Sequence, residues 1–300
     1  DKLILCYQED VKSVLQVHSL MTGDFLKKFN IEIGTVASIF ARRNCSEMFF
    51  TFVSFMSPGV IYYYNFQKPE EEPRVFRDVK LNVPNLRRED YKVEQVFYNS
   101  KDNTKVSMFT VRKKREADSP RPCLLYGFGG LGVSLHPAFG VTGAMFVDTF
   151  DGMLAYPNIR GGGEYGAEWH KAGKQLNKQN TFDDFQAAAK YLIDNGYTTR
   201  ELLVIQGGSN GGLMVSACIN QAPHLFGVAI IQVGITDLLR FPELRHGPSW
   251  MEEYGHYKDK THFENLHKLS PLHNVHAITS AELEYPATLL LTAETDKRIS

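Results

Sequence analysis

Cysteine is scarce in this sequence, and none of it is arranged as a metal or redox motif. The 300 residues contain four cysteines, Cys6, Cys45, Cys123 and Cys218. They are widely spaced, without a C-x-x-C pair or a spacing that suits metal ligands. We therefore expect buried, reduced thiols in a cytoplasmic protein, and no metal site.

Long apolar runs and an excess of one charge are also missing. The longest apolar run, 228–235, has the length of a strand and falls far short of the roughly 18 residues of a membrane span. The 33 basic and 34 acidic residues are interspersed and leave a formal charge of −1. This balance gives no footprint for nucleic acid or an anionic membrane. Peptides or small molecules are the expected partners.

The first 80 residues are rich in short β-type runs. Strands are predicted at 3–7, 14–18, 25–29, 48–55 and 60–66, with turns at Thr22–Asp24 and Ser57–Gly59. The order strand, turn, strand, outlying strand occurs twice, with an offset of roughly 40 to 45 residues that is typical of propeller blades. Because two blades cannot close a propeller, we interpret residues 1–80 as the C-terminal blades of an incomplete β-propeller.

From Tyr91 onward the pattern changes to strands that alternate with helices. A hairpin is predicted at 93–98 and 106–111, and apolar runs at 123–126, 153–159, 202–205, 228–232 and 287–291 suit a sheet that is buried on both faces. Thr181–Asp184 resembles a capping box that opens a helix, and Gly196 would end that helix. Residues 81–300 are therefore predicted to form a doubly wound α/β domain.

One strand-to-helix junction carries the candidate chemistry. The run Gly207-Gly208-Ser209-Asn210-Gly211 has the spacing of a nucleophile elbow, in which a strained turn exposes the serine oxygen. Ser209 is then the candidate nucleophile, and the Asn210 N–H is a candidate oxyanion donor. A glycine-rich turn with a capping serine explains the motif equally well, so its context has to decide.

Two other glycine-rich segments follow strands. Gly127–Gly132 matches G-x-G-x-x-G, but no helix signal follows it as a dinucleotide site requires. We expect this loop to lie beside the elbow and to contribute to an oxyanion hole. The second segment, 160–166, lacks the Gly-Lys-Ser/Thr of a phosphate loop, and Arg160 and Glu164 are expected to make structural polar contacts. No cofactor is therefore predicted.

Taken together, several motifs of this chain resemble the prolyl oligopeptidases, serine peptidases that cut short peptides on the carboxyl side of proline. The resemblance is carried by Tyr126–Gly130, Asn158–Gly166 with Trp169 and His170, Gly207–Gly212, and Ser270–Val275. It implies a seven-bladed propeller that caps an α/β-hydrolase domain. It also implies that proline-containing peptides are the partners and that the full-length protein is a monomer.

The resemblance assigns roles to individual residues. Ser209 matches the nucleophile, and Asp296, just past an apolar strand, matches the acid of the triad. The substrate-binding positions of the family fall on Trp250, Tyr254, Arg298, Ile235 and Ile299. A flat indole can stack on a pyrrolidine ring, and Arg298 would donate to a substrate carbonyl. Without the resemblance, a Trp and a Tyr four residues apart indicate only the core face of a helix.

Three departures from the family pattern stand out. Phe128 occupies the position of an oxyanion-hole tyrosine, so that hydroxyl donor is missing, and Leu131 replaces a pocket phenylalanine. The triad order in this fold is Ser, Asp, His, but every histidine of this chain precedes Asp296. The histidines between 256 and 276 are expected at surfaces and helix ends. We therefore expect the chain to be a fragment that is inactive alone.

Three functional hypotheses follow. The first is a serine endopeptidase that cleaves after proline through an acyl-enzyme on Ser209. The second is a sister oligopeptidase that cuts after basic residues, which is disfavoured because no carboxylate pair is evident for a Lys or Arg side chain. The third is a catalytically weak homologue that binds peptides or protein partners, and it is motivated by Phe128 and Leu131.

Overall fold

The structure, a computed structural model, describes residues 1–79, 87–115, 119–244, 246–276 and 284–296. The chain divides into two compact units. The first comprises Asp1–Glu94, Val111–Lys114 and His136–Phe150, and the second comprises Gln95–Thr110, Arg115–Leu135 and Asp151–Ser300. The boundary predicted near residue 80 falls beside residues outside the described ranges and stays a prediction.

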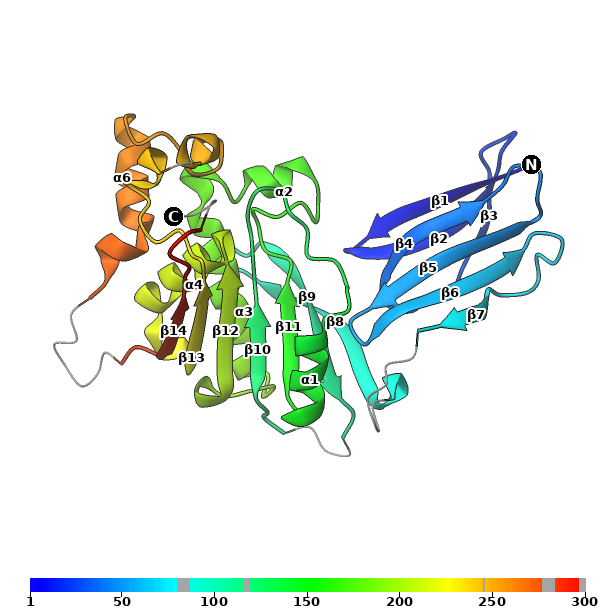
Figure 1. Cartoon of the computed structure of the whole chain (residues 1–300), viewed down its shortest axis with the longest axis horizontal. Coiled ribbons are helices and arrows are strands. Elements are labelled where there is room, and N and C mark those ends of the chain that lie inside the picture. The colour runs from blue at the N-terminus through cyan, green and yellow to red at the C-terminus, as the bar shows by residue number, and fades with distance from the viewer. Residues whose placement is uncertain (80–86, 116–118, 245, 277–283, 297–300) are drawn as a thin grey trace. The chain divides into compact units, whose positions relative to one another are not determined.

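Residues 1–79 of the first unit, all of them described, form two antiparallel sheets. One has three strands, β1 (Lys2–Glu9), β2 (Lys12–Ser19) and β3 (Phe25–Lys28). The other has four, β4 (Thr35–Ala41), β5 (Glu47–Ser54), β6 (Ser57–Asn65) and β7 (Arg74–Asp78) (Figure 1). In β5, Met48, Phe50 and Phe52 are buried while their neighbours are more exposed, which is the alternation of a strand with one face in a core.

Two details of this unit differ from the predictions. Strand β4 was not predicted, and its burial pattern does not alternate as clearly as that of β5. The predicted turn at Ser57–Gly59 is wrong, because these residues begin β6 and the chain turns at Phe55 and Met56. Pro58 is tolerated because the ladder between β5 and β6 shifts register beside it, so a missing N–H costs little.

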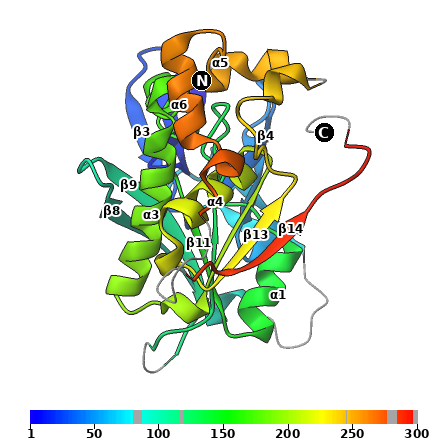
Figure 2. The same ribbon diagram turned by 90° about the vertical axis from the view of Figure 1, so that its left-hand side faces the viewer.

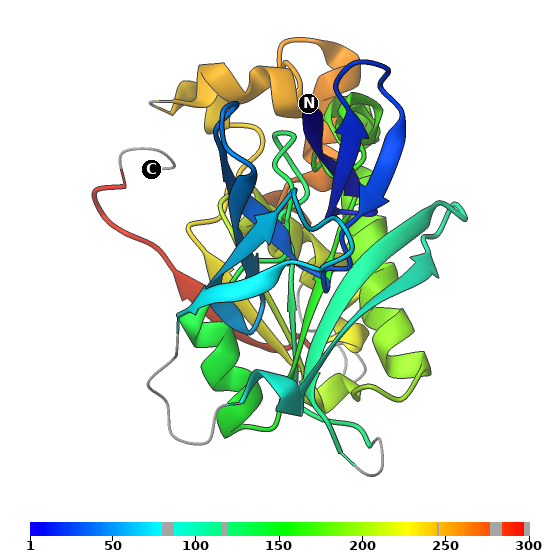
Figure 3. The same ribbon diagram turned by 90° about the vertical axis from the view of Figure 1, so that its right-hand side faces the viewer.

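From β8 onward, the described strands form a seven-stranded sheet in the order β14-β13-β12-β10-β11-β9-β8. Its strands are β8 (Tyr91–Asn99), β9 (Lys105–Lys113), β10 (Cys123–Tyr126), β11 (Met153–Pro157), β12 (Leu203–Gly208), β13 (Val228–Gln232) and β14 (Ala287–Leu291). The pairs β10–β11, β10–β12, β12–β13 and β13–β14 are parallel. Strands β8 and β9 form the predicted hairpin (Figure 3).

The strand order explains where a site belongs. The chain runs from β10 outward to β11 and then returns across β10 to β12, so the winding direction reverses there. In open α/β sheets, ligands bind at the carboxyl ends of the strands at such a switch point. The doubly wound α/β fold predicted from the sequence is confirmed.

Within the described residues, the α-helices are α1 (Val141–Thr149), α2 (Ala167–Lys171), α3 (Gln179–Asp194), α4 (Asn210–Gln221), α5 (Met251–Tyr254) and α6 (Lys260–Leu269). Helices α3 and α4 lie on the same face of the sheet (Figure 2). Every residue of α4 except Gln221 is buried. A helix that is buried on all sides contacts the protein around its whole circumference. Helix α4 therefore gives Ser209, the residue directly before it, a rigid support.

The two ends of helix α3 differ in how well they were predicted. The predicted capping box is wrong, because α3 begins at Gln179 and Thr181 lies inside it, donating to Arg160 O at 2.8 Å. The predicted end is confirmed: Gly196 N bonds Ile193 O, Tyr197 N bonds Leu192 O, and Gly196 has φ +71°. These bonds form a Schellman motif, which favours glycine at the left-handed position.

Strand β14 differs from a buried strand. All its residues are exposed, including Leu289 at 51% and Leu290 at 60%. It pairs with β13 on one side only and forms the edge of the described sheet. The expectation of burial on both faces is therefore wrong for this strand, since a run of apolar residues alone cannot distinguish an edge from a centre.

Candidate active site

The turn at Ser209 has the strained geometry of a nucleophile elbow. Ser209 has φ +55° and ψ −116°, a region that L residues rarely adopt, and it lies between the end of β12 and the start of α4. Its N–H donates to Gln232 O at 2.9 Å, and its carbonyl accepts from Leu213 N at 3.1 Å. The surrounding structure thus holds the serine in a conformation that it would not adopt alone.

The flanking glycines are required by close backbone approaches. A Cβ at Gly207 would lie 2.3 Å from Gly211 O, and one at Gly211 would lie 2.5 Å from Gly127 O. The second approach presses the loop after β10 against the elbow. The prediction that Gly127–Gly132 lies beside the elbow is therefore supported, and no helix opens there as a dinucleotide site would need.

Asn210 links the elbow to two other candidate site residues. Its side chain is buried, its Nδ2 donates to Phe128 O, and its Oδ1 accepts from the Tyr254 hydroxyl at 3.0 Å. Tyr254 is 2% exposed and packs edge-on against Phe241. Burial raises the pKa of Tyr254 well above its usual range, so its hydroxyl remains a donor.

The remaining predicted pocket residues lie in different surroundings. Trp250 is half-buried at the end of a short 3₁₀ turn that leads into α5, and Ile235 is buried in the core of the second unit. Leu131 is 44% exposed, with φ +56°. Arg298 and Ile299 lie outside the described residues.

Asp296 follows β14, whose carboxyl end lies level with that of β12. Gly208 pairs with Gln232, and Gln232 pairs with Leu291, so the ends of β12, β13 and β14 form one edge. Ser209 follows directly after Gly208, and half-buried Asp296 lies five residues beyond Leu291. The topology therefore brings the candidate nucleophile and the candidate acid to the same edge of the sheet.

A buried charged cluster that the sequence analysis missed lies against this site. Lys178 Nζ lies 3.2 Å from Glu253 Oε1, and His170 Nε2 lies 2.7 Å from Glu253 Oε2. Lys178 also donates to Gly129 O at 2.9 Å. His170 belongs to a segment that carries the family resemblance, but no sequence motif marks Lys178 or Glu253. The only hint for Glu253 is its place between Trp250 and Tyr254.

The segment 158–166 supports neighbouring loops. The structural polar contacts predicted for Arg160 and Glu164 are present. Arg160 donates to buried Asp184 and, through its outer nitrogens, to Asp102. Glu164 accepts from Leu135 N at 2.9 Å. Gly132 N bonds Gly161 O, so this segment underlies the loop beside the elbow.

The Arg160–Asp102 pair predicts a pH dependence of stability. Hydrogen bonds from Arg160 lower the pKa of Asp102 to about 2 from its ordinary 3.8. A carboxyl with a lowered folded-state pKa stabilises the fold above its unfolded-state pKa, and this contribution is lost as the pH falls from about 4 to about 2. We expect Asp102→Asn to lose less stability than the wild type over that interval, measured by urea unfolding at several pH values.

Asp194→Asn, in the exposed pair with Lys190, is the matched control for this experiment. Arg160 keeps its bonds to Asp184 in the Asp102 variant, so the fold should be retained. If wild type and Asp102→Asn show the same slope between pH 4 and pH 2, Arg160 does not stabilise the ionised carboxylate in the way described.

The histidines between residues 256 and 276 and the four cysteines were predicted to be structural or surface residues. His262 lies in the first turn of α6, where its N–H donates to the side chain of the N-cap residue Asp259 at 2.9 Å, and His256, His267 and His276 are exposed, as predicted. All four cysteines are free thiols. Cys123 and Cys218 are buried, but Cys6 and Cys45 are exposed, so the expectation of burial is wrong for these two.

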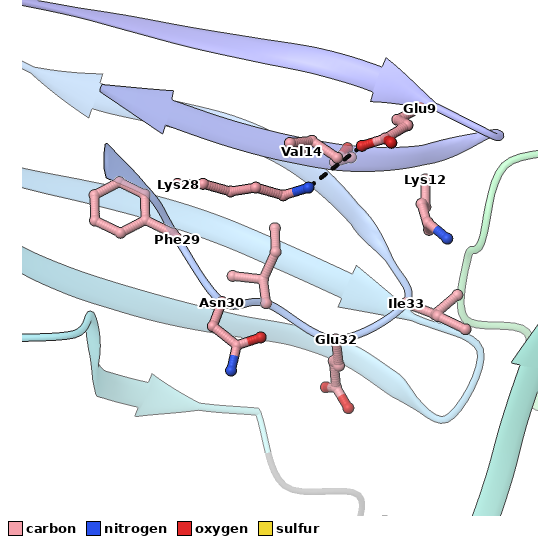
Figure 4. Close-up of a pocket in the computed structure, with 10 residues that line it drawn as sticks. Glu9, Lys12, Val14, Lys28, Phe29, Asn30, Glu32 and Ile33 are labelled. Atoms are coloured by element: carbon pink, nitrogen blue, oxygen red, sulfur yellow. Dashed lines mark hydrogen bonds and ion pairs between the residues drawn. The ribbon is translucent and has the colours of Figure 1, made fainter. Parts of the chain in front are cut away.

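A pocket in the first unit contains none of the predicted site residues. It lies between β2, β3 and the loop that follows β3, and Figure 4 shows Lys28 paired with Glu9 across it. Lys12 and Glu32 also line it, so acidic and basic side chains balance.

No helix within the described part of the chain is long and apolar enough to cross a membrane.

A serine on a strained elbow, at the switch point of a doubly wound sheet, defines the class of α/β-hydrolases. Comparison with known proteins places the chain within that class. The profile of the prolyl oligopeptidase family matches residues 138–300, and that of the N-terminal β-propeller domain of prolyl oligopeptidase matches residues 1–77. The chain belongs to the prolyl oligopeptidase family.

Individual relatives agree with this assignment. Prolyl oligopeptidase ophP of Omphalotus olearius is 39% identical over all of this chain, and prolyl endopeptidase of Dictyostelium discoideum is 36% identical. The solved apo structure of prolyl oligopeptidase B from Galerina marginata superposes with a TM-score of 0.91 at 36% identity, covering 100% of this chain and 42% of that one. The chain spans 40% of the first relative and 39% of the second.

Proposed function

We propose that the protein carrying this sequence is a serine peptidase that hydrolyses short peptides on the carboxyl side of proline. The observation that carries this proposal is the strained Ser209 elbow, joined through Asn210 to Tyr254, a pocket position of the family. Family membership supports the choice of proline. We further propose two domains that meet near residue 80, a cytoplasmic location and a monomeric full-length protein.

In the proposed reaction, Ser209 Oγ attacks the carbonyl carbon of the proline residue, and a histidine base takes the hydroxyl proton. Asp296 orients this histidine, which the family order Ser, Asp, His places after Asp296. The Asn210 N–H, at the start of α4, donates to the oxyanion. The histidine then protonates the leaving amine, and water later releases the acyl group from Ser209.

Substrate binding is assigned to the pocket positions. Trp250 offers a flat face for the pyrrolidine ring, Tyr254 and Ile235 back the pocket, and Leu131 lines its entrance. We propose that Arg298 donates to a substrate carbonyl and that Ile299 forms an aliphatic wall. The leucine at 131 fills less space than an aromatic ring, so other small residues should also be accepted.

The test compares chromogenic peptides that differ only in the residue before the cleaved bond. The full-length protein should cleave the proline peptide, cut an alanine peptide more slowly and leave an arginine peptide intact. A serine-directed phosphonate should label Ser209, as shown by peptide mass spectrometry. Preference for arginine would favour the sister peptidase, and peptide binding without labelling would favour the binding module.

A further inference from the structure

The buried cluster beside the elbow holds two charges almost out of contact with water. The side chains of Lys178 and Glu253 are 1% and 3% exposed, while His170 is 27% exposed. Lys178 immediately precedes α3, and Glu253 lies in α5. Removing charges from water is unfavourable, so this pair needs further hydrogen bonds to be tolerated.

These hydrogen bonds converge on one short stretch of backbone. Lys178 donates to Gly129 O at 2.9 Å. From the other side, Asn210 Nδ2 donates to Phe128 O. The loop beside Ser209 is therefore held at Phe128 by the residue after the nucleophile and at Gly129 by the ion pair.

The same ion pair also contacts the candidate proline pocket. Glu253 directly precedes Tyr254, and Lys178 Nζ lies 5.6 Å from the centre of the Tyr254 ring. Tyr254 in turn donates to Asn210 Oδ1 at 3.0 Å. The contacts form a closed circuit from the loop through Lys178, Glu253, Tyr254 and Asn210 back to the loop.

We propose that Lys178 and Glu253 are positioning residues, whose ion pair fixes the 127–132 loop beside Ser209 and aligns it with α5. This inference rests on the proposed peptidase function. Replacing a buried ion pair by apolar residues is often neutral or stabilising, so stability is a weak reason for this pair. Its contacts instead set the relative position of the oxyanion side and the pocket side of the site, which a reacting peptide must engage together.

The ionisation of the pair agrees with this role. Burial works to raise the pKa of Glu253, but Lys178, His170 and the Leu131 N–H together lower it, so the carboxylate is charged. Burial lowers the pKa of Lys178, and Glu253 acts in the opposite direction. Each charge is thus retained in the interior chiefly by the other.

The test uses Glu253→Gln, Lys178→Met and the double variant in the full-length protein. We expect kcat on a proline peptide to fall on the order of a hundred-fold in each, because small misplacements cost about that much. Hydrogen exchange of the peptide containing 127–132 should become faster in each variant. The double variant, which leaves neither member of the pair as a lone charge, should regain melting temperature without regaining kcat.

Leu192→Ala is the matched control, because it creates a cavity at the other end of α3 and removes none of these polar contacts. It should lower the melting temperature with little change in kcat. The inference is overturned if exchange at 127–132 is unchanged in the variants, or if kcat recovers together with stability. Hydrogen exchange needs no substrate, so it tests the coupling even if the wild type cleaves no proline peptide.

Discussion

Replacing Ser209 by alanine should reduce turnover of proline peptides by the full-length protein about 10⁶-fold. In the proposed mechanism, the alanine removes the oxygen that would form the acyl-enzyme. The main-chain bonds from Ser209 N to Gln232 O and from Leu213 N to Ser209 O do not involve the side chain. The variant should therefore fold, and its melting temperature and single-turnover kinetics are the measurements to make.

Ser216→Ala is the matched control for this experiment. Ser216 is a buried serine of the same helix, and its hydroxyl donates to Gly212 O at 2.8 Å. Its removal costs one hydrogen bond within the helix and should leave turnover close to the wild-type value. If Ser209→Ala retained the wild-type rate, the nucleophile would lie elsewhere and the proposed mechanism would be wrong.

The second large effect should be a gain. We expect Phe128→Tyr to raise kcat on the order of a hundred-fold, because a lost oxyanion donor costs about a hundred- to a thousand-fold in turnover. Phe128 belongs to the loop that Asn210 holds against the elbow. The family resemblance places Phe128 at the position of the tyrosine donor. The gain should appear in kcat more than in KM, since the oxyanion exists only after attack has begun.

Phe97→Tyr, at an exposed position in β8, controls for the added hydroxyl. It should leave both kinetic parameters unchanged. An unchanged rate in Phe128→Tyr would mean that another group already donates to the oxyanion, and the second donor would then have to be sought in the backbone of the same loop. A lower rate would mean that the ring at 128 contributes through packing.

Much of the architecture was predictable because its signals are local. The β5 alternation of buried and more exposed residues, the apolar runs of β10, β12 and β13, and the Gly207–Gly211 spacing each need only a few neighbouring residues. The same local view explains the failures. Thr181 looks like a cap by its type, but its hydroxyl bonds a carbonyl from a distant loop, and β14 has the composition of a central strand at an edge position.

The sequence by itself determined the doubly wound α/β class, the elbow serine and the loops that follow β10 and β11, because periodicity and turn chemistry are written along the chain. Only the tertiary structure decided that Lys178, Glu253 and His170 meet, since they come from three separate segments. It also decided that Asn210 joins Phe128 to Tyr254. Buried charges are tolerated only where folding brings them next to a partner. A local sequence pattern cannot identify a partner that lies in a distant segment of the chain.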